Sequence, residues 1–286
     1  MSSPLTILHS QHSRSWHDNK FVYPVVSRRS KGISIGVNLN PDKVCNFDCI
    51  YCQVDRRSEA ETKFVETAAL LAEIDAMLKL VTTGELFADE AFRNVPAKRR
   101  RLNDIAFAGD GEPTTYRNFD EIISAVADLK RRHDLPGVKM VLITNASMFH
   151  RPAVQRGLAI LDENNGEVWA KLEAGTDEYY QLVERTKIPF RQVLDNITAA
   201  ARIRPLVIQS LFMRISGSAP PPAEIAAFCA RLAEIVSAGG RLRLVQVYTV
   251  ARPPAESYVS SLTDTELEGI ANQVRAIGIP AEIYGA

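Results

Sequence analysis

The sequence has few cysteines, no excess charge of either sign and no long apolar runs. Only four of its 286 residues are cysteine, and 34 lysines plus arginines balance 34 aspartates plus glutamates. A net charge of zero gives no overall attraction to nucleic acid or to an anionic membrane, so a polyanionic partner would need a local patch. Apolar runs such as 68–72 and 105–109 fall far short of the ~20 residues of a membrane span. No segment resembles a signal peptide, so we expect a cytoplasmic protein without a membrane partner.

Three of the four cysteines lie within one short segment, Cys45-Asn46-Phe47-Asp48-Cys49-Ile50-Tyr51-Cys52. Thiolate sulfur is the soft ligand that iron–sulfur clusters require, and such a segment can bring three sulfurs to one cluster. Cys229 lies far along the chain in an apolar helical pattern, where a buried structural thiol is the better interpretation. A 4Fe-4S cluster on three cysteines would keep one iron open, as catalytic zinc sites keep one position open for a non-protein ligand.

Two other uses of the cysteines must be considered. Zinc could be held by three cysteines and one of the five histidines, His9, His12, His17, His133 and His150. Zinc sites usually combine two C-x2-C pairs, however, and the sequence has no second pair. A disulfide framework is disfavoured because three cysteines cannot pair completely. The pattern favours a cluster and leaves a zinc-binding module open.

Strand-like and helix-like segments alternate after a polar stretch, residues 1–30, that we interpret as an N-terminal arm. Strands are predicted at 33–39, 105–108, 138–144, 168–173, 206–213 and 242–250. Helices are predicted at 66–80, 119–132, 153–161, 190–202 and 223–236. A last helix begins at a capping box of Thr263 and Glu266 and ends at Gly278. Residues 31–286 are therefore predicted to form one α/β domain, a parallel sheet covered by helices.

Polar residues recur where predicted strands end, which is where α/β barrels place their functional groups. The cysteines follow the first strand, the segment 109–114 follows the second, and Asn145 ends the third, where it could equally cap a helix. On the fourth strand Lys171 and Glu173 share a face, and two such charges must form an ion pair or bind a ligand. Weaker candidates of the same kind are Gln209, Ser210, Gln246 and Tyr248.

Two basic runs are present, one at 98–101 and the other formed by Arg28, Arg29 and Lys31. Either could bind a phosphate backbone. No aromatic residues are interleaved with the run at 98–101, so a solvated loop is the better interpretation of it.

The C-x3-C-x2-C spacing, with Tyr51 before the last cysteine, resembles the signature of the radical S-adenosylmethionine (radical SAM) superfamily. The Gly111-Glu112-Pro113 segment resembles the Gly-Gly-Glu-Pro element of that family, with Asp110 in place of its first glycine. The resemblance covers about residues 34–251. It implies an α/β fold, a partial (βα)6 TIM-type barrel with parallel strands.

The resemblance also implies a chemistry. The open iron would bind S-adenosyl-L-methionine, and one electron would cleave it to methionine and a 5'-deoxyadenosyl radical that abstracts hydrogen from a substrate. The implied metal ligands are Cys45, Cys49 and Cys52. The candidate S-adenosylmethionine contacts are Tyr51, Gly111, Glu112, Pro113, Asn145, Lys171, Glu173 and Gln209. An electron donor such as flavodoxin or ferredoxin would be required.

The substrate class follows less directly. The segment Asn38-Leu39-Asn40-Pro41 is similar to compact members of the superfamily, the wyosine-type transfer-RNA enzymes and uncharacterised Fe-S oxidoreductases, which implies an RNA base as substrate. Two alternatives stay open. One is an activating enzyme that acts on a protein glycine, and the other is a non-catalytic Fe-S or zinc-binding module.

Overall fold

The structure is a computed structural model that describes residues 16–56, 58–60 and 62–285. His9, His12 and the first half of the predicted arm lie outside the described residues. The described chain forms two compact units. Unit one contains residues 16–45, 58–60, 62–143 and 152–167, and unit two contains 46–56, 144–151 and 168–285.

Unit one is built on four neighbouring strands, β1 (Val22–Ser27), β2 (Gly32–Val37), β3 (Leu102–Phe107) and β4 (Lys139–Thr144). The β1 strand pairs with β2 in antiparallel fashion, whereas β2, β3 and β4 are parallel. All six residues of β2 are buried, as expected for a parallel strand covered on both faces. Residues 22–27 of the predicted arm thus belong to this sheet.

The helices of unit one connect its parallel strands. They are α2 (Thr67–Thr83), α3 (Phe119–Arg132) and α4 (Pro152–Glu163), with the short 3-10 helices η1 (Glu85–Ala88), η2 (Ala97–Arg99) and η3 (Pro113–Thr115) in the connections. The α3 helix has two acidic residues in its first turn and three basic residues in its last. This distribution complements the helix dipole.

Unit two repeats the alternation of strand and helix. Its strands β5 (Gly166–Lys171), β6 (Leu206–Leu211), β8 (Leu242–Tyr248) and β10 (Ala281–Tyr284) are parallel neighbours in that order. Its helices are α5 (Asp177–Glu184), α6 (Phe190–Ile203), α7 (Pro222–Ser237) and α8 (Asp264–Ala276). A small antiparallel pair, β7 (Met213–Ile215) and β9 (Val259–Ser261), lies apart from the main strands.

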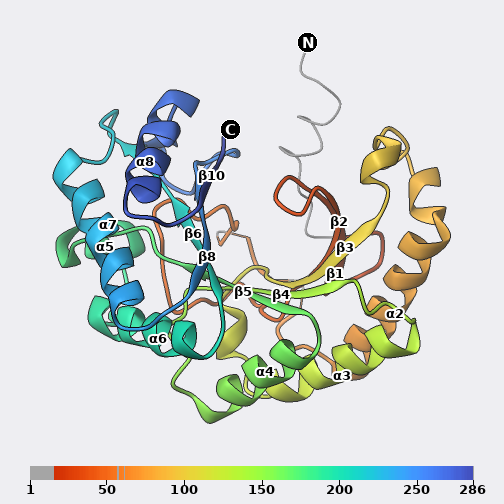
Figure 1. The fold of residues 1–286 in the computed structure, drawn as a ribbon. Coiled ribbons are helices and arrows are strands. Elements are labelled where there is room, and N and C mark those ends of the chain that lie inside the picture. The colour runs from red at the N-terminus through yellow and green to blue at the C-terminus, as the bar shows by residue number, and fades with distance from the viewer. Residues whose placement is uncertain (1–15, 57, 61, 286) are drawn as a thin grey trace. The chain divides into compact units, whose positions relative to one another are not determined.

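The predicted α/β fold, a partial TIM-type barrel with parallel strands, is confirmed by this order of strands and helices (Figure 1). The capping box of Thr263 and Glu266 is present at the start of α8. The sequence did not predict α5, β10 or the β7–β9 pair. No strand was predicted for the apolar stretch 22–27. No helix among the described residues combines the length and apolar character needed to cross a membrane.

Candidate functional site

The cysteine segment of unit two is bound to the C-terminal end of α5. The carbonyl of Val183 accepts a hydrogen bond from the amide of Ile50 (2.9 Å), and that of Glu184 accepts one from Asp48 (3.1 Å). The last carbonyls of a helix lack partners within the helix, so they are free to bind a passing loop. The amide of Cys52 then donates to the carbonyl of Cys49 (2.9 Å), which closes a tight turn between the two cysteines.

Two apolar side chains anchor this turn in the core. Ile50 is fully buried and Tyr51 is 5% exposed, and both pack in one cluster with Val183, Leu211 and Tyr248. Because Ile50 and Tyr51 point into the core, the chain between the two cysteines is fixed by packing as well as by backbone hydrogen bonds.

Arg185 reinforces the same contact. It follows α5 in the left-handed conformation (φ 44°). Its guanidinium donates to the carbonyl of Asp48 (2.8 Å), lies 3.3 Å from the Asp48 carboxylate, and donates to Glu256 (2.7 Å). The amide of Ala255 also donates to the carbonyl of Cys52 (2.8 Å). The cysteine turn is thus held from two sides, by α5 and by the chain around residue 255.

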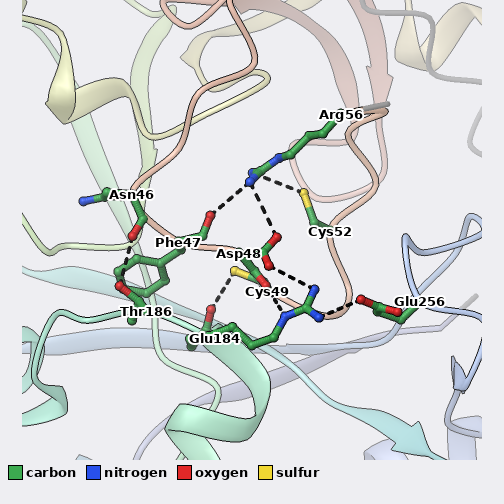
Figure 2. A network of polar contacts seen from close by, with 10 residues as sticks. Asn46, Phe47, Asp48, Cys49, Cys52, Arg56, Glu184, Thr186 and Glu256 are labelled. Atoms are coloured by element: carbon green, nitrogen blue, oxygen red, sulfur yellow. Dashed lines mark hydrogen bonds and ion pairs between the residues drawn. The ribbon is translucent and has the colours of Figure 1, made fainter. Parts of the chain in front are cut away.

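The two cysteines of the turn have different polar neighbours (Figure 2). The thiol of Cys49 donates to Oε2 of buried Glu184 at 2.7 Å. Burial, and next the nearby Glu184 carboxyl, raise the pKa of the Cys49 thiol, and burial raises the pKa of Glu184. Cys52 instead faces a cation, because Nη2 of Arg56 lies 3.6 Å from its sulfur.

Tyr51 connects the turn to Lys171, the last residue of β5, and to Glu173, which lies two residues beyond the end of that strand. Its hydroxyl donates to Oε1 of Glu173 (3.0 Å) and accepts from Nζ of Lys171 (3.0 Å), which also lies 4.7 Å from the centre of the Tyr51 ring. Lys171 and Glu173 form an ion pair at 3.7 Å. Burial lowers the pKa of Lys171, but Tyr248 and Glu173 raise it more, and burial raises that of Glu173. The structure therefore brings Tyr51, Lys171 and Glu173 together.

Asn145 also contacts the cysteine segment. Its amide nitrogen donates to Oδ1 of Asn46 (2.8 Å), and its own Oδ1 accepts from the backbone and hydroxyl of Ser147 (3.1 and 2.6 Å). Gln209 lies elsewhere in unit two, where it donates to Gln246 on the neighbouring strand (3.1 Å). Gln209 and Gln246 thus satisfy each other within the sheet.

The Gly-Glu-Pro segment belongs to unit one. A Cβ on Gly111 would lie 2.2 Å from the carbonyl oxygen of Val44, the residue before Cys45, so only glycine fits there. The carboxylate of Glu112, 3% exposed, caps η3 by accepting from the amide (3.1 Å) and hydroxyl (2.5 Å) of Thr114. Pro113 occupies the first turn of η3.

The Asn38-Leu39-Asn40-Pro41 segment packs against the Gly-Glu-Pro segment within unit one. Asn38 donates to the carboxylate of Asp110 (2.7 Å), and Asn40 donates to Thr115 (3.2 Å). The amide of Asp110 donates back to Asn38 (3.1 Å). The residue that departs from the family pattern, Asp110, therefore has a structural role in joining these loops.

The thiol chemistry of the chain suits an iron–sulfur cluster. None of the four cysteines, which all lie in the described chain, forms a disulfide. Cys45, Cys49 and Cys52 are partly exposed, and Cys229 is buried in α7 as predicted. No three histidine, cysteine, aspartate or glutamate side chains of the described chain are gathered to hold a single metal ion. The fit to a cluster rests on the donor set, three accessible soft ligands in one segment of which two project from a fixed turn.

Sequence reasoning missed three residues of this network, Arg56, Glu184 and Arg185. Glu184 and Arg185 lie at the end of α5, a helix of eight residues with little periodic signal. The acidic first turn after Thr176 could have indicated that helix. Arg56 lies four residues after Cys52, and nothing in its local pattern shows that it folds back to the cysteine.

Comparison with known proteins gives a family and a fold. A family model described as the radical SAM superfamily matches residues 39–214. The chain is 30% identical over 142 residues to a UPF0026 protein of Helicobacter pylori, covering 49% of this chain and 39% of that protein. It is 28% identical over 200 residues to a protein of Brachyspira hyodysenteriae named GTPase Obg, covering 69% and 26%. The chain thus matches well under half the length of either relative.

Among solved structures, the chain is similar to a radical SAM methyltransferase from Sphaerobacter thermophilus. The TM-score is 0.63 at 12% sequence identity, and the match covers 93% of this chain and 69% of that chain. At this identity the likeness concerns the fold.

Proposed function

The chain belongs to the radical SAM superfamily, and from this premise we propose that it is an enzyme that cleaves S-adenosylmethionine reductively and uses the resulting radical to take hydrogen from a substrate. Its similarity to UPF0026 proteins fits the uncharacterised branch expected from the sequence. The observation that carries the proposal is the cysteine turn, in which α5 and the core fix Cys49 and Cys52 while neither thiol forms a disulfide.

In this proposal Cys45, Cys49 and Cys52 hold a 4Fe-4S cluster. When bound and reduced, the cluster would supply the electron that converts S-adenosylmethionine to methionine and a 5'-deoxyadenosyl radical. A donor such as flavodoxin or ferredoxin would deliver that electron. We expect this enzyme to work in the cytoplasm.

The S-adenosylmethionine contacts that the sequence predicts are kept as part of the proposal. Glu112 would receive its ammonium group, because a buried carboxylate forms strong charge-assisted hydrogen bonds, and Gly111 and Pro113 would shape the backbone around it. Lys171 and Glu173, held by Tyr51, offer one cation and one carboxyl to the polar groups of the cofactor. Asn145 and Gln209 are candidates for further polar contacts.

An RNA base is the substrate that we propose. It is supported by the two basic runs, which unit one brings to one place. Asn103 donates to the carbonyl of Ser30, and the amide of Ile33 donates to the carbonyl of Arg101 (2.8 Å), so residues 28–31 lie beside residues 98–101. Arg100 is occupied within its own loop, where it donates to the carbonyl of Val95 (2.8 Å). The exposed side chains of Lys31, Lys98 and Arg101 give a local basic patch of the kind that an overall neutral protein needs to bind a polyanion.

Cluster binding is tested by iron and sulfide analysis after anaerobic reconstitution. Wild-type protein should bind four irons and four sulfides per chain. Cys49→Ala should lose most of this iron and its visible absorption, whereas Cys229→Ala, the matched control, should keep both. Full iron and absorption in Cys49→Ala would show the assignment to be wrong. Zinc in place of iron would favour a zinc-binding module.

A further inference from the structure

Arg56 is the one cation of the described network that lies against a cysteine sulfur. Its Nη2 lies 3.6 Å from Sγ of Cys52, and its Nη1 donates to the carbonyl of Phe47 (3.1 Å) and lies 3.8 Å from Oδ1 of Asp48 (Figure 2). The guanidinium thus bridges the two ends of the cysteine turn, from Phe47 before Cys49 to Cys52 after it.

This contact lies at the protein surface, where the Arg56 side chain is less exposed than that of Asp48. The Arg56 side chain is 29% exposed, whereas the carboxylate-bearing side chain of Asp48 is 60% exposed. Asp48 is also shared with Arg185 at 3.3 Å, so it neutralises Arg56 only in part. A guanidinium keeps its charge at every working pH, and its attraction for a nearby negative charge is stronger here than in bulk water.

The charge of Arg56 acts on one of the three cysteine ligands, Cys52. Glu184 places a carboxyl against Cys49, whereas Arg56 places a cation against Cys52. When a 4Fe-4S cluster accepts an electron it gains one negative charge, which spreads onto its cysteine sulfurs. Hydrogen bonds to those sulfurs and nearby charge are among the factors that set the reduction potential of such clusters. A cation at the Cys52 sulfur must favour the reduced form.

We propose that Arg56 is a positioning residue whose charge raises the reduction potential of the cluster through Cys52 and so makes the cluster easier for the electron donor to reduce. The inference rests on the proposed function, because it needs a cluster on the three cysteines. It assigns a role in reduction to a residue outside the cysteine motif.

The test is a redox titration of the reconstituted full chain, in which electron paramagnetic resonance measures the reduced cluster at each potential. At the wild-type midpoint, Arg56→Gln should lower the ratio of reduced to oxidised cluster about tenfold, which for a one-electron couple is a midpoint about 59 mV lower. Arg56→Lys keeps the charge and should stay within about threefold of wild type. Arg191→Gln removes an exposed arginine that pairs with Asp195 and should change nothing.

Each outcome separates the inference from the proposed function. Wild-type protein that takes up no cluster contradicts the proposed function itself. A cluster with the same midpoint potential in wild type, Arg56→Gln and Arg56→Lys overturns the inference. An equal shift of the midpoint in both variants also overturns it, because Arg56 would then act only by holding the loop to Phe47. If Arg56→Gln loses its cluster, Arg56→Met serves as the second uncharged variant. Loss of the cluster in both uncharged variants, with retention in Arg56→Lys, supports the inference that the charge of Arg56 acts on the cluster. Loss of the cluster in all three variants overturns the inference.

Discussion

Tyr51 determines how the cysteine turn is coupled to the buried charges of unit two. Its ring packs with Ile50 and Tyr248, while its hydroxyl lies between Lys171 and Glu173. An aromatic residue beside a cysteine is often read only as a packing residue. Here the same side chain supplies both the packing that fixes the turn and the hydrogen bonds that hold an ion pair in place.

Removing the Tyr51 hydroxyl should therefore destabilise the protein without creating a large cavity. We expect Tyr51→Phe to lower the free energy of unfolding by about 1–3 kcal/mol, because it leaves a buried charged pair short of a hydrogen-bond partner. Urea denaturation of the metal-free protein measures this change. Tyr258→Phe, at a side chain 41% exposed, is the control and should stay within about 0.5 kcal/mol of wild type. Equal effects in the two variants would mean that the buried hydroxyl has no such role.

A substitution of Glu112 can separate an effect on S-adenosylmethionine binding from an effect on folding. Glu112→Gln keeps an oxygen that can accept from Thr114, so the cap of η3 and the melting temperature should change little. The negative charge is lost, and a charged hydrogen bond is about twice as strong as a neutral one. We expect S-adenosylmethionine affinity to fall about tenfold, or about 1.4 kcal/mol, measured by anaerobic titration calorimetry.

The control for this measurement is Glu90→Gln, at an exposed residue that pairs with Arg93. It should leave the affinity unchanged. Wild-type affinity in Glu112→Gln would remove Glu112 from the proposed cofactor site.

At the scale of elements, the α5 helix links the cysteine turn to the rest of unit two. Thr176 caps its first turn by accepting from the amide of Tyr179 (3.2 Å), and it donates to Glu224 on α7 (2.7 Å). At the other end, the carbonyls of Val183 and Glu184 bind the cysteine segment. We therefore expect a change at the start of this short helix to affect the cysteine turn.

Thr176→Ala should remove both the cap and the bond to Glu224. We expect a loss of about 1–2 kcal/mol in the free energy of unfolding, together with faster hydrogen exchange at the amides of Asp48 and Ile50. Thr176→Ser keeps the hydroxyl and should restore most of both. Unchanged exchange at those two amides in Thr176→Ala would show that the start of α5 does not control the turn.

The elements that sequence could predict are the ones with a long or repeated signal. The apolar parallel strands and the amphipathic helices of ten or more residues were found because burial imposes a period on them. The α5 helix and β10, of eight and four residues, are too short to show one. In the site, the sequence placed Lys171 and Glu173 on one face because strand alternation is local, and it left an ion pair and a ligand contact both open. The Cys49–Glu184 contact joins residues 135 positions apart and has no local pattern.

At the scale of the whole molecule, the matched family segment and the proposed cofactor residues coincide. Residues 39–214 contain the three cysteines and every proposed S-adenosylmethionine contact, from Tyr51 to Gln209. Beyond that segment lie β8, β10, α7 and α8, together with Gln246, Tyr248 and Glu256. Since a shared fold does not fix the substrate, we expect substrate specificity to depend on residues other than the matched cofactor positions, such as the basic runs at 28–31 and 98–101.

The central claim is that this chain cleaves S-adenosylmethionine reductively, and product analysis tests it most directly. Reconstituted wild-type protein, given a strong reductant and S-adenosylmethionine without substrate, should slowly form 5'-deoxyadenosine and methionine in equal amounts. The variant with Cys45, Cys49 and Cys52 all changed to alanine should form neither, because it has no cluster to deliver the electron. If chromatography finds no 5'-deoxyadenosine from a fully reconstituted and reduced wild-type sample, with or without candidate RNA and peptide substrates, the chain is a cluster-binding module and the claim is contradicted.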